Sequence, residues 1–281
     1  MPSQDAYLSS TAKWIAAARA RESRRPDRLF NDPYADALAG EAGRAALARS
    51  EAASGGENLF LPVRTRYFDD LSMATVAEGR QQIVLLGAGL DTRAYRLPLP
   101  AEVRIYELDQ AEVLAGKERT LATLDARPQC TVHRVGGDLS GTWVDGLEAA
   151  GFQATLPSLW LAEGLFFYLA ESTLRRLLGL ALERAAPGSL LAADVFGTGL
   201  LRQPQMQPYL RWLVAQRRPR PYCTDHPADL LNECGWQTRS LTYPGAPDAN
   251  YGRWPAPAAP PADPPSPSDR AYFVTARAGS L

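Results

Sequence analysis

Two short stretches of this sequence have residue types that could bind a nucleotide. A glycine turn, Gly87-Ala88-Gly89-Leu90-Asp91-Thr92, directly follows the apolar run 82–86, and the run 103–109 ends in the acids Glu107 and Asp109. Glycine lets a backbone approach a ligand where a Cβ atom would clash. A carboxylate at the end of the next strand can accept hydrogen bonds from two ribose hydroxyls. Together the two stretches predict a site for an adenosine-containing cofactor.

The residues at the end of the turn bear on which cofactor would bind. The dinucleotide motif has a third glycine where this chain has Thr92, and that glycine allows close packing beneath a pyrophosphate. Asp91 adds a negative charge that a pyrophosphate would disfavour. The turn therefore favours a cationic or zwitterionic cofactor such as S-adenosylmethionine over NAD. A tight turn that binds no ligand is the structural alternative.

Composition limits the protein classes. The chain has 281 residues, 46% of them hydrophobic, which is enough to bury a full core. A net charge of −1 predicts no field that would recruit nucleic acid or anionic membranes. Three cysteines (Cys130, Cys223 and Cys234) form an odd, sparse set typical of a reducing compartment. No apolar run reaches the roughly 18 residues of a membrane span, and Asp5 and Lys13 interrupt any signal peptide. We expect a cytoplasmic protein of undefined oligomeric state.

Hydrophobic periodicity predicts helices first and then alternating strands and helices. Helices are expected over about 11–21, 34–39 and 61–78. Strands are expected over 82–86, 103–109, 130–135, 158–162, 190–195, 236–243 and 272–276, with helices over 110–124, 171–184, 203–217 and 227–234. The alternation indicates an α/β fold, a doubly wound and mostly parallel Rossmann-like sheet with a helical N-terminal extension and a lid.

The last two expected strands are separated by 244–269, a segment with nine prolines and no helical pattern. Without a crossover helix, these strands must run antiparallel to be adjacent. A parallel sheet that ends in an antiparallel pair is typical of class I methyltransferases. We therefore expect one domain over 1–281, with a helical cap over 1–80, a cofactor-binding core over 81–195, and lid helices and C-terminal strands over 196–281. The N-terminal helices and segment 200–222 would form the lid.

Several catalytic motifs are absent from the sequence. It contains no nucleophile elbow, no phosphate-binding P-loop and no Cys-x-x-Cys pair. Cys130 and His133 lie three residues apart on an expected strand, so they face opposite ways and cannot share a metal. His133 and His226 are the only histidines. We predict no metal site and assign no catalytic residue, because in this reading the cofactor carries the reactive group.

Several motifs resemble those of the leucine carboxyl methyltransferase family, from about Thr11 to Tyr168 and more loosely beyond. The nearest branch includes bacterial carboxyl O-methyltransferases of the tetracenomycin polyketide type. The shared motifs are Thr11-Ala12-Lys13-Trp14, Ala18-Arg19-Ala20-Arg21-Glu22-Ser23, Arg25-Pro26-Asp27-Arg28-Leu29-Phe30-Asn31-Asp32-Pro33-Tyr34, Val63-Arg64-Thr65-Arg66-Tyr67-Phe68-Asp69-Asp70, Leu86-Gly87-Ala88-Gly89-Leu90-Asp91-Thr92-Arg93 and Ala162-Glu163-Gly164-Leu165. The resemblance implies a class I S-adenosylmethionine-dependent O-methyltransferase.

The resemblance also implies a set of cofactor-binding residues. Arg64 and Lys13 would lie near the methionine carboxylate, Gly87 beneath the methionine portion and Asp109 at the ribose. The other implied contacts are Asp138 and Leu139 at the adenine and Glu163 at the cationic end. Glu107, on the same side of its strand as Asp109, would assist. From the residues alone, Arg64 could equally belong to a solvated ion-pair face, Asp138 could cap a helix, and Glu163 could be a satisfied polar residue at a strand end.

The acceptor implied by the resemblance is a carboxylate on a small metabolite or peptide. A carboxylate is ionised at pH 7 and needs no base, whereas a phenol, the alternative acceptor, would need one. A non-catalytic S-adenosylmethionine-binding module and an NAD-dependent dehydrogenase are the other classes considered. A cluster of basic residues could be a solvated helix end or could steer an anionic acceptor; it consists of Arg19, Arg21, Arg24, Arg25 and Arg28.

Overall fold

The structure is a computed structural model that describes residues 4–139, 141, 143–203, 206–215, 220–254 and 266–279, with only the backbone described at 4–10, 208 and 212. By its internal contacts the chain divides into two compact units, Met1–Phe152 and Gln153–Leu281. Within the described residues, no helix is both long enough and apolar enough to span a membrane.

The first unit begins with three helices, α1 (Gln4–Ser23), α2 (Ala35–Ser54) and α3 (Phe60–Ala77). Buried alanines let α1 and α2 lie close together, and at Gly43 a Cβ atom would come within 2.5 Å of the Lys13 carbonyl oxygen. The helix expected over 34–39 is too short, because the chain kinks at Gly40 (φ 58°) and then resumes the helix to Ser54. α3 begins and ends within one residue of the expected helix.

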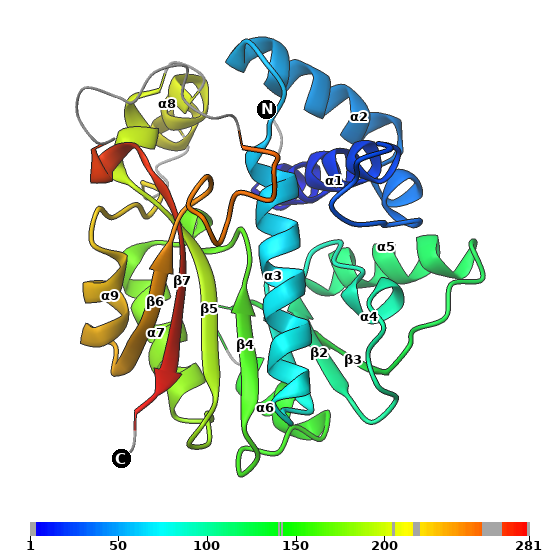
Figure 1. The fold of residues 1–281 in the computed structure, drawn as a ribbon, viewed down its shortest axis with the longest axis vertical. Coiled ribbons are helices and arrows are strands. Elements are labelled where there is room, and N and C mark those ends of the chain that lie inside the picture. The colour runs from blue at the N-terminus through cyan, green and yellow to red at the C-terminus, as the bar shows by residue number, and fades with distance from the viewer. Residues whose placement is uncertain are drawn as a thin grey trace. The chain divides into compact units, whose positions relative to one another are not determined.

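Three parallel strands of the first unit follow these helices (Figure 1). They are β1 (Gln82–Leu86), β2 (Arg104–Asp109) and β3 (Thr131–Gly136), with α4 (Arg93–Arg96), α5 (Ala111–Ala122) and α6 (Trp143–Ala149) around them. All five positions of β1 are buried, as expected for a strand covered on both faces. The register pairs Leu86 with Leu108 and Asp109 with Gly136, so the three strands end at one edge.

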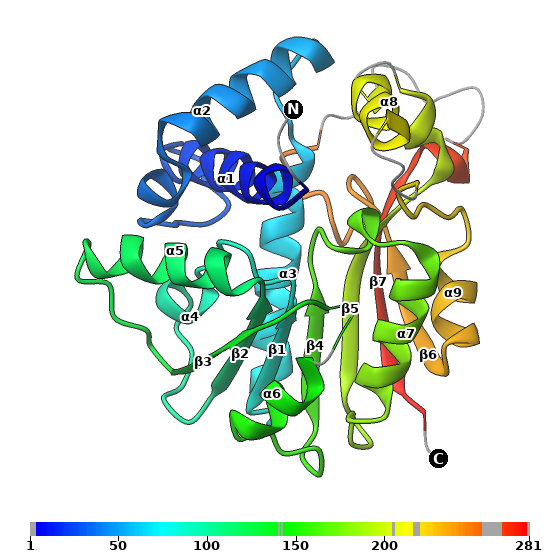
Figure 2. The same ribbon diagram turned by 180° about the vertical axis from the view of Figure 1, so that it is seen from behind.

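The second unit contains four strands, β4 (Ser158–Ala162), β5 (Leu190–Phe196), β6 (Trp236–Thr242) and β7 (Ala271–Ala278). β4 and β5 pair parallel, whereas β7 pairs antiparallel with both β5 and β6. The helix α7 (Glu171–Leu182) lies in front of strands β5 and β7 in the view of Figure 2. The indole nitrogen of the buried Trp236 donates to the Leu178 carbonyl at 3.0 Å and so fixes α7 to β6.

The strand order is β3-β2-β1-β4-β5-β7-β6. This order confirms the expected doubly wound, mostly parallel sheet that ends in an antiparallel pair. The reversal has a simple cause: among the described residues between β6 and β7 there is no α-helix that could form a crossover, and the two strands pair antiparallel.

The remaining C-terminal elements of the second unit are short. They are η1 (Phe166–Tyr168), η2 (Thr198–Arg202), α8 (Gln207–Ala215), α9 (Pro227–Glu233) and η4 (Pro267–Asp269). α8 is a shorter form of the helix expected over 203–217, of which residues 204–205 and 216–217 lie outside the described part. In the segment 244–269, residues 244–254 form turns, in agreement with the irregular structure expected, and 255–265 are not described.

Candidate active site

The turn after β1 owes its shape to two glycines. Gly87 has φ 67° and Gly89 has φ 50°, a left-handed conformation that other residues rarely adopt. The turn is fixed to its neighbour strand because the Ala88 amide donates to the Leu108 carbonyl at 2.9 Å. It closes on itself through the Asp91 amide, which donates to the Ala88 carbonyl at 2.9 Å. The backbone of this turn is therefore held before any ligand binds.

Asp109, at the end of β2, holds the same turn from the side. Its Oδ2 accepts a hydrogen bond of 2.6 Å from the Gly89 amide, and its Oδ1 accepts one of 2.7 Å from the Gln110 amide. Burial raises the pKa of Asp109 above its ordinary value, although these two amide bonds oppose the rise. An ionised carboxylate has about four acceptor positions. Among the described residues, the bonds from the Gly89 and Gln110 amides use two of those on Asp109.

The loop after β3 lies next to Asp109. The Gly137 amide donates to the Asp109 carbonyl at 2.9 Å, and the register places Gly136 opposite Asp109. Asp138 is exposed and Leu139 is half-buried. The structure thus brings the turn at Gly87, Asp109 and the loop at 137–139 to one edge of the sheet.

Arg64 and Lys13 lie on helices of the same unit. Arg64 is only 3% exposed, and its guanidinium carbon lies 5.4 Å from the ring centre of Phe60. This burial disagrees with the alternative of a solvated ion-pair face. Lys13 is exposed on α1. Its neighbour Ala12 lies against the turn, because a Cβ atom on Gly89 would be 3.7 Å from the Ala12 Cβ.

Glu163 belongs to the second unit, in the turn that follows β4. It is half-buried, and the next residue, Gly164, has φ 66°. The Gly164 amide donates to Oδ1 of Asp194 on β5 at 2.5 Å. Asp194, which is 2% exposed, was not among the residues expected from the sequence. This turn therefore has the same construction as the first, with a strand aspartate holding a glycine amide.

The negative charge of Asp91 is compensated within the protein, contrary to the expectation that it would favour a cationic cofactor. The Arg93 guanidinium forms an ion pair with Oδ2 of Asp91, and the Arg93 amide donates to its Oδ1 at 2.7 Å. Burial alone raises the pKa of Asp91, but Arg93 and other nearby cations outweigh it and keep the pKa below the ordinary value. Asp91 is thus ionised but compensated within the protein, so its charge does not select a cationic cofactor.

Glu107 has a structural role in place of the expected assistance at the ribose. Its Oε1 accepts a hydrogen bond of 2.7 Å from Nζ of Lys117, and both side chains are buried. Asp109 instead faces the turn through the bond to Gly89. Of the two acids at the end of β2, Asp109 is therefore the one available to a ligand at this edge.

The basic cluster is not uniformly solvated. Arg19 is 8% exposed and forms a buried ion pair of 2.9 Å with Asp32, contrary to the interpretation as a solvated helix end. Arg21 pairs with Glu51 at 2.6 Å and Arg24 with Asp36 at 2.8 Å. Because acids offset these charges, the cluster offers less steering to an anionic acceptor than its sequence indicates.

The two histidines lie in different units of the chain. His133, on β3, stacks on Tyr106 with ring centres 4.9 Å apart, and burial lowers its pKa. His226 precedes α9 in the second unit. The described residues contain no cluster of three or more potential metal ligands.

An open groove of about 390 Å³ lies between segment 29–33, α3 and residues 95–97, and none of the expected cofactor residues lines it.

Comparison with known proteins identifies the family. Residues 12–182 match the family model for leucine carboxyl methyltransferase, which is more than half of the chain. This chain belongs to the leucine carboxyl methyltransferase family. The fold and the family expected from the sequence are thereby confirmed.

Named relatives agree with this assignment. A protein of Parafrankia sp., named "Putative S-adenosyl-L-methionine-dependent methyltransferase", is 44% identical over 196 residues, which cover 67% of this chain and 63% of the relative. A protein of Mycolicibacterium smegmatis with the same description is 43% identical over 198 residues, covering 66% of each chain. The match thus spans slightly less than two thirds of these relatives. Their names agree with S-adenosylmethionine, the cofactor expected from the sequence.

Two solved structures share the fold at low sequence identity. A DUF574 family protein from Streptomyces avermitilis has a TM-score of 0.61 and 18% identity, over 95% of this chain and 96% of that one. A protein from Thermobifida fusca, titled a "putative methyltransferase", has a TM-score of 0.55 and 17% identity, over 92% and 93%. At these identities the likeness concerns the fold alone.

Proposed function

We propose that this protein is an S-adenosylmethionine-dependent O-methyltransferase that forms a methyl ester on a carboxylate of a small metabolite or peptide. The observation that carries the proposal is the contact of 2.6 Å between Oδ2 of Asp109 and the Gly89 amide. This contact joins the glycine turn to an acid at the end of the second strand, the position from which an acid can bind ribose hydroxyls. The chain belongs to the leucine carboxyl methyltransferase family.

The chemistry of the expected residues fits the cofactor. Asp109 would use two acceptor positions for the ribose hydroxyls, beside its bonds to Gly89 and Gln110. The buried Arg64 guanidinium suits a carboxylate, since its planar donors can bind both oxygens at once. Lys13 would add a second cation, Gly87 would leave space beneath the methionine portion, and Glu163 would face the cationic end. Asp138 and Leu139 would contact the adenine.

The chain's own contribution is to bind, orient and dehydrate the reactants. When bound, S-adenosylmethionine supplies a methyl group whose bond to sulfur breaks as the acceptor oxygen attacks the carbon, with the electron pair left on sulfur. Alignment of the two reactants can contribute about 7–11 kcal/mol. Removal of water from a carboxylate strengthens its attraction to a sulfonium cation. No side chain has to remove a proton, and His133 stacks on Tyr106 within the first unit.

The test is a transfer assay with S-adenosylmethionine labelled in the methyl group and a panel of carboxylic acids and phenols. We expect label in a product that releases methanol in mild alkali, since methyl esters hydrolyse whereas aryl methyl ethers survive. Label that resists alkali would indicate a phenolic acceptor and would contradict the carboxylate proposal. Cofactor binding without transfer to any acceptor in the panel would favour a non-catalytic binding module.

A further inference from the structure

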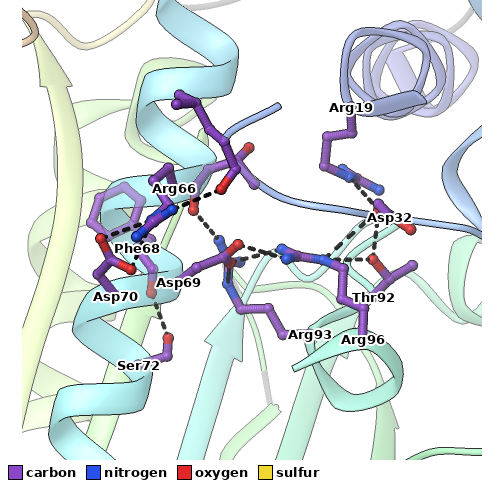
Figure 3. A network of polar contacts seen from close by, with 12 residues as sticks. Arg19, Asp32, Arg66, Phe68, Asp69, Asp70, Ser72, Thr92, Arg93 and Arg96 are labelled. Atoms are coloured by element: carbon purple, nitrogen blue, oxygen red, sulfur yellow. Dashed lines mark hydrogen bonds and ion pairs between the residues drawn. The ribbon is translucent and has the colours of Figure 1, made fainter. Parts of the chain in front are cut away.

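A buried ionic network connects the N-terminal helices to the glycine turn within the first unit (Figure 3). It contains three arginines and three aspartates, so its formal charges balance. Its members come from α1, segment 29–34, α3, the glycine turn and α4, and they are Arg19, Asp32, Asp69, Asp91, Arg93 and Arg96. Five of these side chains are at most 9% exposed.

Arg19 is the member of the network that reaches directly from α1 to the turn. Its Nε donates to Oδ2 of Asp32 at 2.9 Å, while its Nη2 donates to the Leu90 carbonyl at 2.6 Å. Leu90 lies between Gly89 and Asp91, in the centre of the turn. A single guanidinium therefore joins the N-terminal segment to the backbone that would contact the cofactor.

Asp32 holds the far end of the same turn. Its Oδ2 also accepts a hydrogen bond of 2.7 Å from the hydroxyl of Thr92, and its Oδ1 accepts one of 3.2 Å from the Tyr34 amide. Burial alone raises the pKa of Asp32, but Arg19, Arg96 and the hydrogen bond from Thr92 outweigh it, so the pKa lies below the ordinary value. Asp32 is therefore an ionised anchor to which both Arg19 and Thr92 are bound.

The turn conformation depends on contacts from both sides. Asp109 holds the Gly89 amide from β2, whereas Arg19 and Asp32 hold Leu90 and Thr92 from the N-terminal segment. A binding loop whose shape is fixed in advance loses less conformational freedom when its ligand binds. Residues that fix such a loop without touching the ligand affect affinity through the loop alone.

We propose that Arg19 and Asp32 are positioning residues that hold the turn 87–92 in the conformation required for cofactor binding. The inference rests on the proposed function, which assigns the cofactor to this turn. Its consequence is that Arg19 and Asp32 contribute to cofactor affinity through the turn, without contacting the cofactor themselves.

The protein provides a matched control on α3. Arg66 pairs with Asp70 at 2.8 and 2.9 Å and donates to the Leu29 carbonyl at 2.8 Å, so it too joins a helix to segment 29–34. These contacts involve no atom of the turn, and both side chains are more exposed than Arg19 and Asp32. Asp70→Asn thus removes a more exposed ion pair of the same unit and leaves the contacts with the turn in place.

The test compares Arg19→Lys with Asp70→Asn and with the wild-type chain. Lysine keeps the charge beside Asp32 but lacks the planar fork that spans Asp32 and Leu90. We measure affinity for S-adenosylhomocysteine by calorimetry and amide hydrogen exchange of the peptide over 87–92. For Arg19→Lys we expect about tenfold weaker affinity, the loss of one charge-assisted hydrogen bond, together with faster exchange in this peptide. Asp70→Asn should change neither.

Each other outcome of this comparison is informative. Weaker affinity without faster exchange, or faster exchange with unchanged affinity, would overturn the positioning role, as would no change in either. If Arg19→Lys does not fold, as judged by its thermal melt, Asp32→Asn takes its place with the same expected results. Steady-state kinetics give a second readout. Arg19→Lys should raise the KM for the cofactor while kcat stays near that of the wild type.

A further variant separates the inference from the proposed function. Asp109→Ala removes a direct contact of the proposed site. If Asp109→Ala weakens affinity but Arg19→Lys does not, the cofactor site stands and only the positioning role is wrong. If Asp109→Ala binds as tightly as the wild type, the cofactor does not use this turn as proposed and both proposals are overturned.

Discussion

The Gly89 amide donates a hydrogen bond of 2.6 Å to the carboxylate of Asp109, twenty residues further along the chain. The bond joins the turn after β1 to the end of β2, so the residue proposed to bind the ribose also shapes the turn proposed to hold the methionine portion. One carboxylate therefore connects two parts of the candidate site.

The pH dependence of cofactor binding should reflect Asp109. Burial raises the pKa of this carboxyl, so it takes up a proton at a higher pH than an ordinary aspartate would. Only the ionised form offers all acceptor positions to the ribose hydroxyls. We expect affinity for S-adenosylhomocysteine to be constant at neutral pH and to fall as the pH drops through the raised pKa, with proton release on binding in that range. Calorimetry in buffers of different ionisation enthalpy measures both. Affinity that rises as the pH falls would contradict the role of the ionised carboxylate.

Arg64 should act as a two-pronged clamp on the cofactor carboxylate. Because a lysine has no planar pair of donors, Arg64→Lys should raise the KM for S-adenosylmethionine by about tenfold, the loss of one charge-assisted bond, while the far-ultraviolet circular dichroism stays unchanged. Arg66→Lys, two residues further along α3 and with a side chain that is 39% exposed, is the matched control and should leave the KM near that of the wild type. Wild-type kinetics in Arg64→Lys would show that the clamp is wrongly assigned.

The buried pair Glu107–Lys117 should support the fold without contributing to cofactor affinity. Glu107→Gln leaves the ammonium of Lys117 buried beside a neutral side chain, and the loss of one partner of a buried pair typically costs about 3–5 kcal/mol. Urea denaturation measures this loss in the free energy of unfolding. Glu118→Gln removes the exposed contact of 3.0 Å with Arg134 and should cost less than about 1 kcal/mol. A large loss of cofactor affinity in folded Glu107→Gln would indicate that Glu107 does take part in binding the ribose.

The pH dependence of turnover should distinguish the two acceptor types. An ionised carboxylate needs no proton removal, so kcat should stay nearly flat from about pH 6 to 8, well above an ordinary carboxyl pKa. A phenol has a pKa near 10, and its rate should rise through this range unless a base assists. Steady-state rates with an acceptor from the transfer assay decide between the two, and a rate that climbs steadily through neutral pH would contradict the carboxylate.

Much of the fold was predictable because most elements have strong local patterns. The limits of β1 and β4 agree with the buried apolar runs, and the antiparallel end of the sheet followed from the missing crossover helix. The short helices α4 and α6 were missed as defined elements, since four and seven residues are too few for a clear helical period. The continuation of α2 beyond Gly40 was missed because glycine locally resembles a helix end.

The candidate site was predictable only where its residues lie close together along the chain. Gly87 and Asp109 belong to one strand–turn–helix–strand unit, and the Gly89 amide joins this turn to Asp109. For Arg19 the sequence indicates only a solvated helix end or a steering charge, because no local pattern reveals a partner 71 residues away at Leu90. The signal that could have indicated these contacts is that Arg19, Asp32 and Thr92 all lie within motifs that resemble those of the family. Asp194 gave no such signal, since it lies inside an apolar strand.

The most direct test of the central claim is the affinity of Asp109→Ala for S-adenosylhomocysteine, measured by calorimetry at neutral pH beside the wild type and Asp70→Asn. The account predicts that Asp109→Ala binds about 10- to 100-fold more weakly, since a lost charge-assisted pair of hydrogen bonds corresponds to roughly 1.5–3 kcal/mol, while Asp70→Asn binds as the wild type does. Equal affinity of Asp109→Ala and the wild type would contradict the account, because the cofactor would then not depend on the carboxylate at the end of β2.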